Sequence, residues 1–285
     1  MEIGVFLSYI NKNKINSYQT IILKQNSKKM KTTTKFILAV AIFLPLINIA
    51  QINSRGEAIN KAGMQRMYAM KMAKNYMAIG AGIKVAEANK ELEETSTSFN
   101  ENYNDLMIYA KTKELKDALA SSGIVWNKFR EKVNETPTKD DASGVISEAY
   151  NLLNSCNVVV DKLVVSNGGK LATLQNICGR QRALSQKLGL LYIAKVWQVP
   201  YSTLGKELNE TLTTFENSLS LLTLAPENTE EINTILKLQQ SEWNFTKKSF
   251  DINAEKLSPI SVYSSTNLMT RNYENATGLY EKLVF

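Results

Sequence analysis

Apolar and small residues recur at three- and four-residue spacing in the part of the chain that follows residue 50. From Ile59 to Met77 they form one face that also carries Arg66, and the same periodicity continues to Leu92. This pattern predicts a long first helix. Strand signals are weak, because runs of β-branched residues such as Val158–Val160 are short and continue a helical pattern. The pattern therefore predicts an all-α fold.

Polar segments rich in helix-capping residues interrupt this periodicity. In the first half of the chain they are Glu94–Ser98, Asn134–Pro137 and Ser166–Gly169. The corresponding breaks in the second half are marked by prolines, namely Pro200, Pro226 and Pro259. Long helices joined by short connections predict tandem up-and-down helical bundles.

The chain also repeats itself. Asn60-Lys-Ala-Gly-Met-Gln-Arg66 recurs as Asn176-Ile-Cys-Gly-Arg-Gln-Arg182 at an offset of 116 residues, and Trp126 recurs as Trp243 at an offset of 117. An offset this steady over about a hundred residues indicates a tandem duplication. We expect the two tryptophans to be core or interface anchors, with ligand stacking as the alternative.

A leader precedes the repeat. Lys31 and Lys35 stand before an uncharged apolar run of 14 residues, Phe36–Ile49, which Ala50 follows. This arrangement is typical of a signal peptide, and the run is short of the roughly 20 residues that span a bilayer. We expect cleavage near Ala50 and a periplasmic or secreted protein. The expected organisation is an upstream extension outside the native protein at 1–29, the signal peptide at 30–50, and helical modules at 52–167 and 168–285.

Charge and composition narrow the function. The formal net charge is +7, but residues 1–50 hold seven lysines and one acid, so 27 basic and 26 acidic residues remain after them. The basic character thus belongs to the leader, which argues against nucleic acid as a partner. The chain has no histidine, the commonest general base and zinc ligand. With no phosphate loop or metal-ligand spacing visible, we predict a non-enzymatic protein without metal or cofactor.

Arg66 and Arg182 lie on helical stripes that are otherwise small or apolar. A glycine, Gly63 or Gly179, stands three residues before each of them. Glycine lets a second helix or a ligand approach the backbone closely. An arginine fork there suits a carboxylate, a phosphate or a planar oxyanion. The alternative is that the arginine stem covers apolar surface while its head reaches solvent.

The segment Ile59–Met67 resembles the P-box of the nitrate/nitrite sensor module, and Asn176–Leu188 is similar to the version in the type IV pilus transducer N-terminal family. The resemblance implies that the lysine and arginine of the motif bind an anion between two helical subunits. Ile177 replaces the lysine in the second copy, where Arg180 could compensate. The expected ligand-binding residues are Lys61, Gly63, Arg66, Gly179, Arg180 and Arg182.

Two hypotheses follow. The leading one is an exported sensor-like protein that binds a small oxyanion such as nitrate or nitrite. The alternative is a helical interaction or adaptor protein whose small-residue faces dock onto a membrane receptor or pilus component, without a small ligand. A signalling partner and a homodimer fit either hypothesis. The sequence leaves open whether the modules pack side by side or end to end, which decides whether Arg66 and Arg182 share one site.

Cys156 and Cys178 are the two cysteines, and they flank the break at Ser166–Gly169. A tight helical hairpin there would place them at one level, where an oxidising compartment would permit a disulfide. Helices continuing in line would separate them by about 33 Å, too far for a bond. A disulfide is therefore possible but not required.

Overall fold

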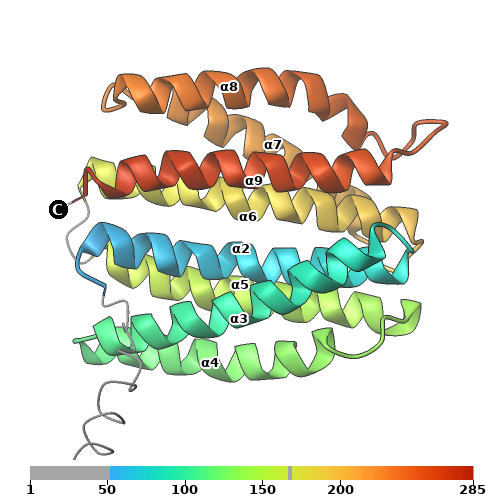
Figure 1. The fold of residues 1–285 in the computed structure, drawn as a ribbon, viewed down its shortest axis with the longest axis horizontal. Coiled ribbons are helices and arrows are strands. Elements are labelled where there is room, and N and C mark those ends of the chain that lie inside the picture. Colours follow the sequence, from blue (N-terminus) through green and yellow to red (C-terminus); the bar gives the residue numbers. More distant parts are fainter. Residues whose placement is uncertain (1–51, 166–168, 285) are drawn as a thin grey trace, which may run out of the picture. The chain divides into compact units, whose positions relative to one another are not determined.

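A computed structural model of the chain describes residues 52–165 and 169–284. Within these residues it contains eight α-helices, one short 3-10 helix and no strand, which confirms the all-α fold (Figure 1). None of these helices is both long and apolar enough to cross a bilayer. The upstream extension, the signal peptide and the cleavage position fall outside the described residues. The helices are α2 (Arg55–Gly80), α3 (Val85–Tyr109), α4 (Lys113–Val133), α5 (Lys139–Val165), α6 (Lys170–Val196), α7 (Leu204–Thr223), α8 (Glu230–Thr246), η1 (Lys247–Phe250) and α9 (Pro259–Glu281).

The helices form two four-helix bundles, α2–α5 and α6–α9. In the first bundle α2 packs against α3 and α5, and in the second α6 packs against α7 and α9. The bundles lie side by side, because α2 packs along α6 (Figure 1). The larger apolar cluster contains buried residues of both bundles, so the two halves share a core.

The prediction that the first helix continues through Leu92 is wrong. Helix α2 ends at Gly80, and a turn in which Gly82 and Lys84 have φ angles of 71° and 45° leads into α3. These left-handed conformations end the helix although the apolar periodicity continues. Gly80 itself is required, since a Cβ there would lie 2.2 Å from an atom of the Trp197 ring.

The break expected at Glu94–Ser98 is also wrong, because this segment lies inside α3. Thr95 and Phe99 are buried one turn apart, whereas Glu93, Glu94 and Thr97 lie on the exposed face of the helix. The chain turns later, before Thr112, which caps α4 by accepting a hydrogen bond from the Leu115 backbone N–H. The breaks at Asn134–Pro137 and near the three prolines are confirmed.

Several contacts occur in both bundles. Trp126 stacks on Phe99 with ring centroids 4.2 Å apart, and Trp243 packs on Phe215 at 4.5 Å. Each tryptophan is 2% exposed, which confirms that both are core anchors.

The bundle ends match as well. The Tyr76 hydroxyl accepts a hydrogen bond from the Thr138 backbone N–H at 3.2 Å, and the Tyr192 hydroxyl accepts one from Ser258 at 2.9 Å. These contacts at the helix ends therefore recur in both bundles.

Candidate functional site

The central contact of the molecule is between α2 and α6, and the two predicted arginines lie in it. Arg66 is 1% exposed and Arg182 is fully buried. A Cβ on Gly63 would lie 3.1 Å from Arg182 Nη2 and 3.3 Å from Arg66 Nη2, and one on Gly179 would lie 3.1 and 3.7 Å from the same atoms. Both guanidinium groups thus meet beside the two glycines. The arginine heads do not reach solvent, so the surface-covering interpretation is wrong.

The hydrogen bonds of the two guanidinium groups are few and long. Arg66 Nη1 donates to Asn157 Oδ1 at 3.3 Å, while Arg182 donates from Nε to the Gly179 carbonyl and from Nη2 to the Asn60 carbonyl, both at 3.4 Å. Arg66 Nε, Arg66 Nη2 and Arg182 Nη1 have no partner among the described residues. Well-formed N–H···O bonds are usually 2.7–3.2 Å. The pair therefore keeps much of its donor capacity unused.

The two cations also lack a close counter-ion. No Asp or Glu in the described part of the chain lies within 4.0 Å of either guanidinium group. Burial lowers the pKa of Arg66 to about 9, and the positive charges of Arg180 and Arg182 contribute to this shift. Burial likewise lowers the pKa of Arg182, against the opposing effect of Glu274. Arginine stays protonated at neutral pH, so these shifts express a free-energy cost of burying the two charges together.

The other two predicted cations are placed differently. Lys61 Nζ lies 2.5 Å from Asp105 Oδ2 on α3 and 3.9 Å from Glu57 Oε1, so its charge is already paired. Arg180 is exposed, and its charge acts on Arg66. Of the six expected ligand-binding residues, the structure thus brings together the two glycines and the two buried arginines.

Sequence reasoning missed the groups that accept hydrogen bonds from the arginines. Asn157 stands on α5 immediately after Cys156, in a largely apolar stretch. Its position there, as an amide directly before the apolar run Val158–Val160, was the available signal. The Asn60 contribution comes from a backbone carbonyl, and no residue pattern reveals that.

The possible disulfide is not formed. Both cysteines are buried free thiols. Cys156 Sγ lies 3.7 Å from Ser122 Oγ on α4, and Cys178 Sγ lies 3.8 Å from the Tyr273 carbonyl on α9. The reason is that α5 packs on α2 and α4, whereas α6 packs on α2 and α9, so the two thiols face different neighbours.

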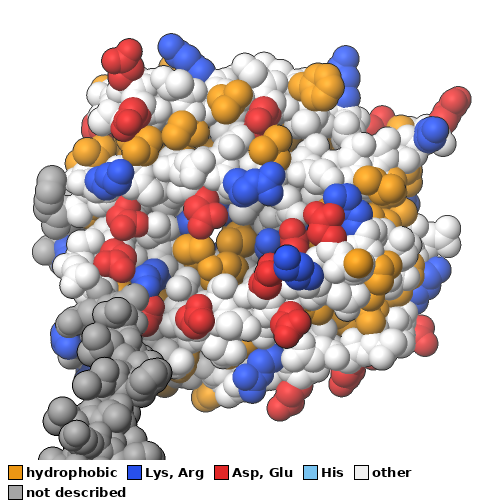
Figure 2. Space-filling model, viewed as in Figure 1, with side chains coloured by type: hydrophobic (Ala, Val, Ile, Leu, Met, Phe, Trp, Pro, Cys, Tyr) orange, Lys and Arg blue, Asp and Glu red, His pale blue; other side chains and the backbone are white. Residues whose placement is uncertain are grey.

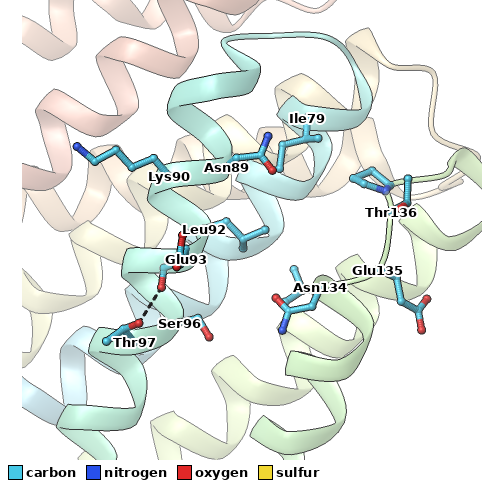
Figure 3. A pocket seen from close by; sticks show the side chains of 12 residues that line it. Ile79, Asn89, Lys90, Leu92, Glu93, Ser96, Thr97, Asn134, Glu135 and Thr136 are labelled. Atoms are coloured by element: carbon cyan, nitrogen blue, oxygen red, sulfur yellow. Dashed lines mark hydrogen bonds between the residues drawn. The ribbon is translucent and has the colours of Figure 1, made fainter.

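Four surface cavities in the described part of the chain have neither arginine in their lining. One of about 630 Å³ lies between α3 and the α4–α5 connection, where Thr97 donates to the Glu93 carbonyl (Figure 3). Its wall includes the carboxylates of Glu93 and Glu135, and Lys90 points away from the connection (Figure 3). This cavity is therefore poorly suited to an anion.

A cavity of about 500 Å³ lies at the corresponding place in the second bundle, between α7 and the segment after α8. On the face of the molecule in Figure 2, acidic and basic side chains are interspersed, and apolar side chains follow the seam between α8 and α9. No group of three or more metal-binding side chains occurs among the described residues. The arginine pair is therefore the candidate site with the most distinctive chemistry.

Comparison with known proteins gives one match. Residues 47–136 match the PilJ family model, described as the N-terminal part of type IV pili methyl-accepting chemotaxis transducers. The matched segment contains α2, α3 and α4, with Lys61, Gly63 and Arg66, and ends before α5. No curated protein and no solved structure matches the chain.

Proposed function

We propose that this chain is an exported, non-enzymatic sensor-like protein that binds one small oxyanion between Arg66 and Arg182. In this proposal the two bundles, at 52–167 and 168–285, are tandem copies of a PilJ-type module that pack as an internal pseudo-dimer. The family match to chemotaxis transducers and the contacts common to both bundles support it. A membrane signalling protein is the proposed partner.

The meeting of two buried arginines without a carboxylate is the observation that carries this proposal. Removing a charged group from water costs several kcal/mol even after relaxation, and an unpaired cation does not recover that cost. An anion that accepts hydrogen bonds from both forks would supply the missing charge and use the free Arg66 and Arg182 donors. Nitrate and nitrite have this planar, multiply accepting geometry.

The surroundings restrict the size of the ligand. Even one added carbon at Gly63 would lie 3.1 Å from Arg182 Nη2, so the space beside the arginines is narrow. We therefore propose a small anion of three or four heavy atoms, not a phosphorylated metabolite or a peptide carboxylate.

Titration calorimetry with nitrate, nitrite, formate and acetate tests the proposal. We expect binding heat with at least one planar oxyanion, and a loss of affinity of at least about tenfold in Arg66→Gln and Arg182→Gln, since a charge-assisted pair contributes about 1.5–3 kcal/mol. Arg130→Gln is the matched control, because Arg130 lies on α4 beside Trp126. Folded protein that gives no heat with any of the four anions would refute the small-anion proposal.

The alternative of docking through small-residue faces has less support. Gly63 and Gly179 are buried between α2 and α6, next to the arginines, so these faces already pack against each other. A partner would have to bind elsewhere on the molecule.

A further inference from the structure

Lys74 is a second buried cation on α2, two turns after Arg66, and it has no exposed surface. Its stem passes beside Gly189 of α6, where a Cβ would lie 2.8 Å from Lys74 Cδ and 2.8 Å from Thr266 Oγ1. Gly189 thus provides the space that the lysine occupies. At the repeat offset of 116 the counterpart of Lys74 is Leu190, so this charge is present in one half alone.

The ammonium group of Lys74 has few partners. Its Nζ lies 2.5 Å from Asn267 Oδ1 and 4.2 Å from the centroid of the Tyr263 ring, both on α9. No carboxylate in the described part of the chain lies within 4.0 Å of it. A protonated lysine has three donors and no acceptor, so one amide oxygen and one ring satisfy it incompletely.

Glu91 of α3 is the acid that most favours the charged form of Lys74, but its oxygens are occupied by other groups. Tyr263 donates its hydroxyl to Glu91 Oε2 at 3.0 Å, Asn267 donates Nδ2 to Oε1 at 2.9 Å, and Lys71 Nζ lies 3.5 Å from Oε2. The carboxylate therefore accepts hydrogen bonds from the same α9 residues, Tyr263 and Asn267, that contact Lys74. It compensates the lysine charge only from a distance.

This network connects the two halves of the molecule. Lys74 and Glu91 belong to the first bundle, whereas Tyr263 and Asn267 belong to the second, in which Gln186 of α6 also donates to Asn267 Oδ1 at 3.1 Å. A change in the charge of Lys74 would consequently alter the hydrogen bonds between the bundles.

The charges around Lys74 do not offset its burial. Burial lowers the pKa of Lys74 to about 7, and Lys71 on the same helix and Lys84 in the α2–α3 turn act in the same direction. Glu91 and Glu87 of α3 oppose them. From α9 the facing titratable group is Tyr263, whose own pKa is raised by burial and by Glu91. From α6 the facing groups are Gly189 and the Gln186 amide, which carry no charge.

We propose that Lys74 is a proton-sensitive latch between the two bundles, in which the neutral amine stabilises the closed α2–α9 contact and protonation favours its opening. The direction follows from linkage, because a lysine that becomes hydrated in an open state binds its proton more tightly there than in the closed state. With pKa values of about 7 closed and 10.5 open, the open population rises by about tenfold between pH 8 and pH 6. The latch does not require the anion site.

Amide hydrogen exchange of the full chain at pH 6 and pH 8, corrected for intrinsic exchange rates, tests this proposal. In the unaltered protein we expect protection across Val262–Thr270 of α9 to fall by about tenfold on acidification. Lys74→Leu, which places the residue of the second half in the first, should remove this dependence. Lys90→Leu, at an exposed lysine of α3, should keep it. The same pH dependence in Lys74→Leu, or none in the unaltered protein, would overturn the proposal.

A second measurement covers the case in which Lys74→Leu does not fold. The lysine ¹³Cε signals of the unaltered protein can be followed by NMR, and the Lys74 signal is identified by its proximity to the Tyr263 ring. A titration midpoint near 7 supports the latch, and a midpoint near 10 refutes it. Neither experiment requires an anion, so failure of the latch is distinct from failure of anion binding.

Discussion

Helices α2 and α6 are counterparts by the repeat offset and pack against each other, yet they differ in the buried charge they carry. At the level of Arg66 and Arg182, which we call the symmetric level, both helices contribute the same buried group. Two turns later, at what we call the asymmetric level, α2 has Lys74 where α6 has Leu190, and Gly189 of α6 provides the space for the lysine. The symmetric level is where we propose the anion site, whereas the asymmetric level makes the two halves unequal.

The largest effect we expect concerns the core tryptophans, Trp126 and Trp243, which the two halves have in common. Trp126→Ala and Trp243→Ala should each lower the free energy of unfolding by about 3–5 kcal/mol, because each removes a fully packed indole from a core. Since the apolar core includes both bundles, denaturation followed by circular dichroism should show one transition in both variants. Two separate transitions would mean that the bundles fold independently, and the comparison between them would then be one between separate domains.

The second effect tests whether the buried charges of Arg66 and Arg182 are uncompensated in the absence of an anion. Replacing both Arg66 and Arg182 by Leu should raise the free energy of unfolding in anion-free buffer, by about 1–4 kcal/mol, because two uncompensated buried charges are removed. The same protein should show no stabilisation by nitrate or nitrite in thermal denaturation. If the double substitution is instead strongly destabilising without anion, the arginines are satisfied as they stand and the site needs no ligand.

The third effect concerns Lys74, at the asymmetric level. The folded pKa of Lys74, about 7, lies below its unfolded value of 10.5. Below pH 7 both states are protonated and the burial cost is fully present. Between pH 7 and pH 10.5 only the unfolded state keeps the proton, so stability rises with pH by up to about 1.4 kcal/mol per unit.

Lys74→Leu should therefore be more stable than the unaltered protein at pH 6, and the difference should shrink as the pH rises toward 10. Urea denaturation of both proteins across this range measures it, with Lys90→Leu as a control that shows no such trend. A difference independent of pH would indicate that Lys74 contributes through packing alone.

The sequence predicted most of the helices, because buried residues recur with the helical period over long segments. It missed the turn after Gly80, since the apolar periodicity continues across residues that adopt left-handed conformations. It selected Arg66 and Arg182 from their small-residue neighbours, but their meeting depends on how α2 packs on α6. The burial of Lys74 was not predicted, because a lysine in a helical pattern is ordinarily exposed. Its burial depends on Gly189, which is more than a hundred residues away.

The smallest effect that we expect concerns the N-terminal caps of α4 and α8, which lie outside α2 and α6. Thr112 caps α4 and Thr229 caps α8, and each accepts a backbone N–H at 3.3 Å from the third residue of its helix. Thr112→Ala and Thr229→Ala should each lower the free energy of unfolding by about 1 kcal/mol, the usual contribution of such a cap. Because the two caps are equivalent, urea denaturation should give equal losses. An unequal loss would show that the bundles differ in stability outside α2 and α6, so the asymmetry could not be assigned to Lys74 alone.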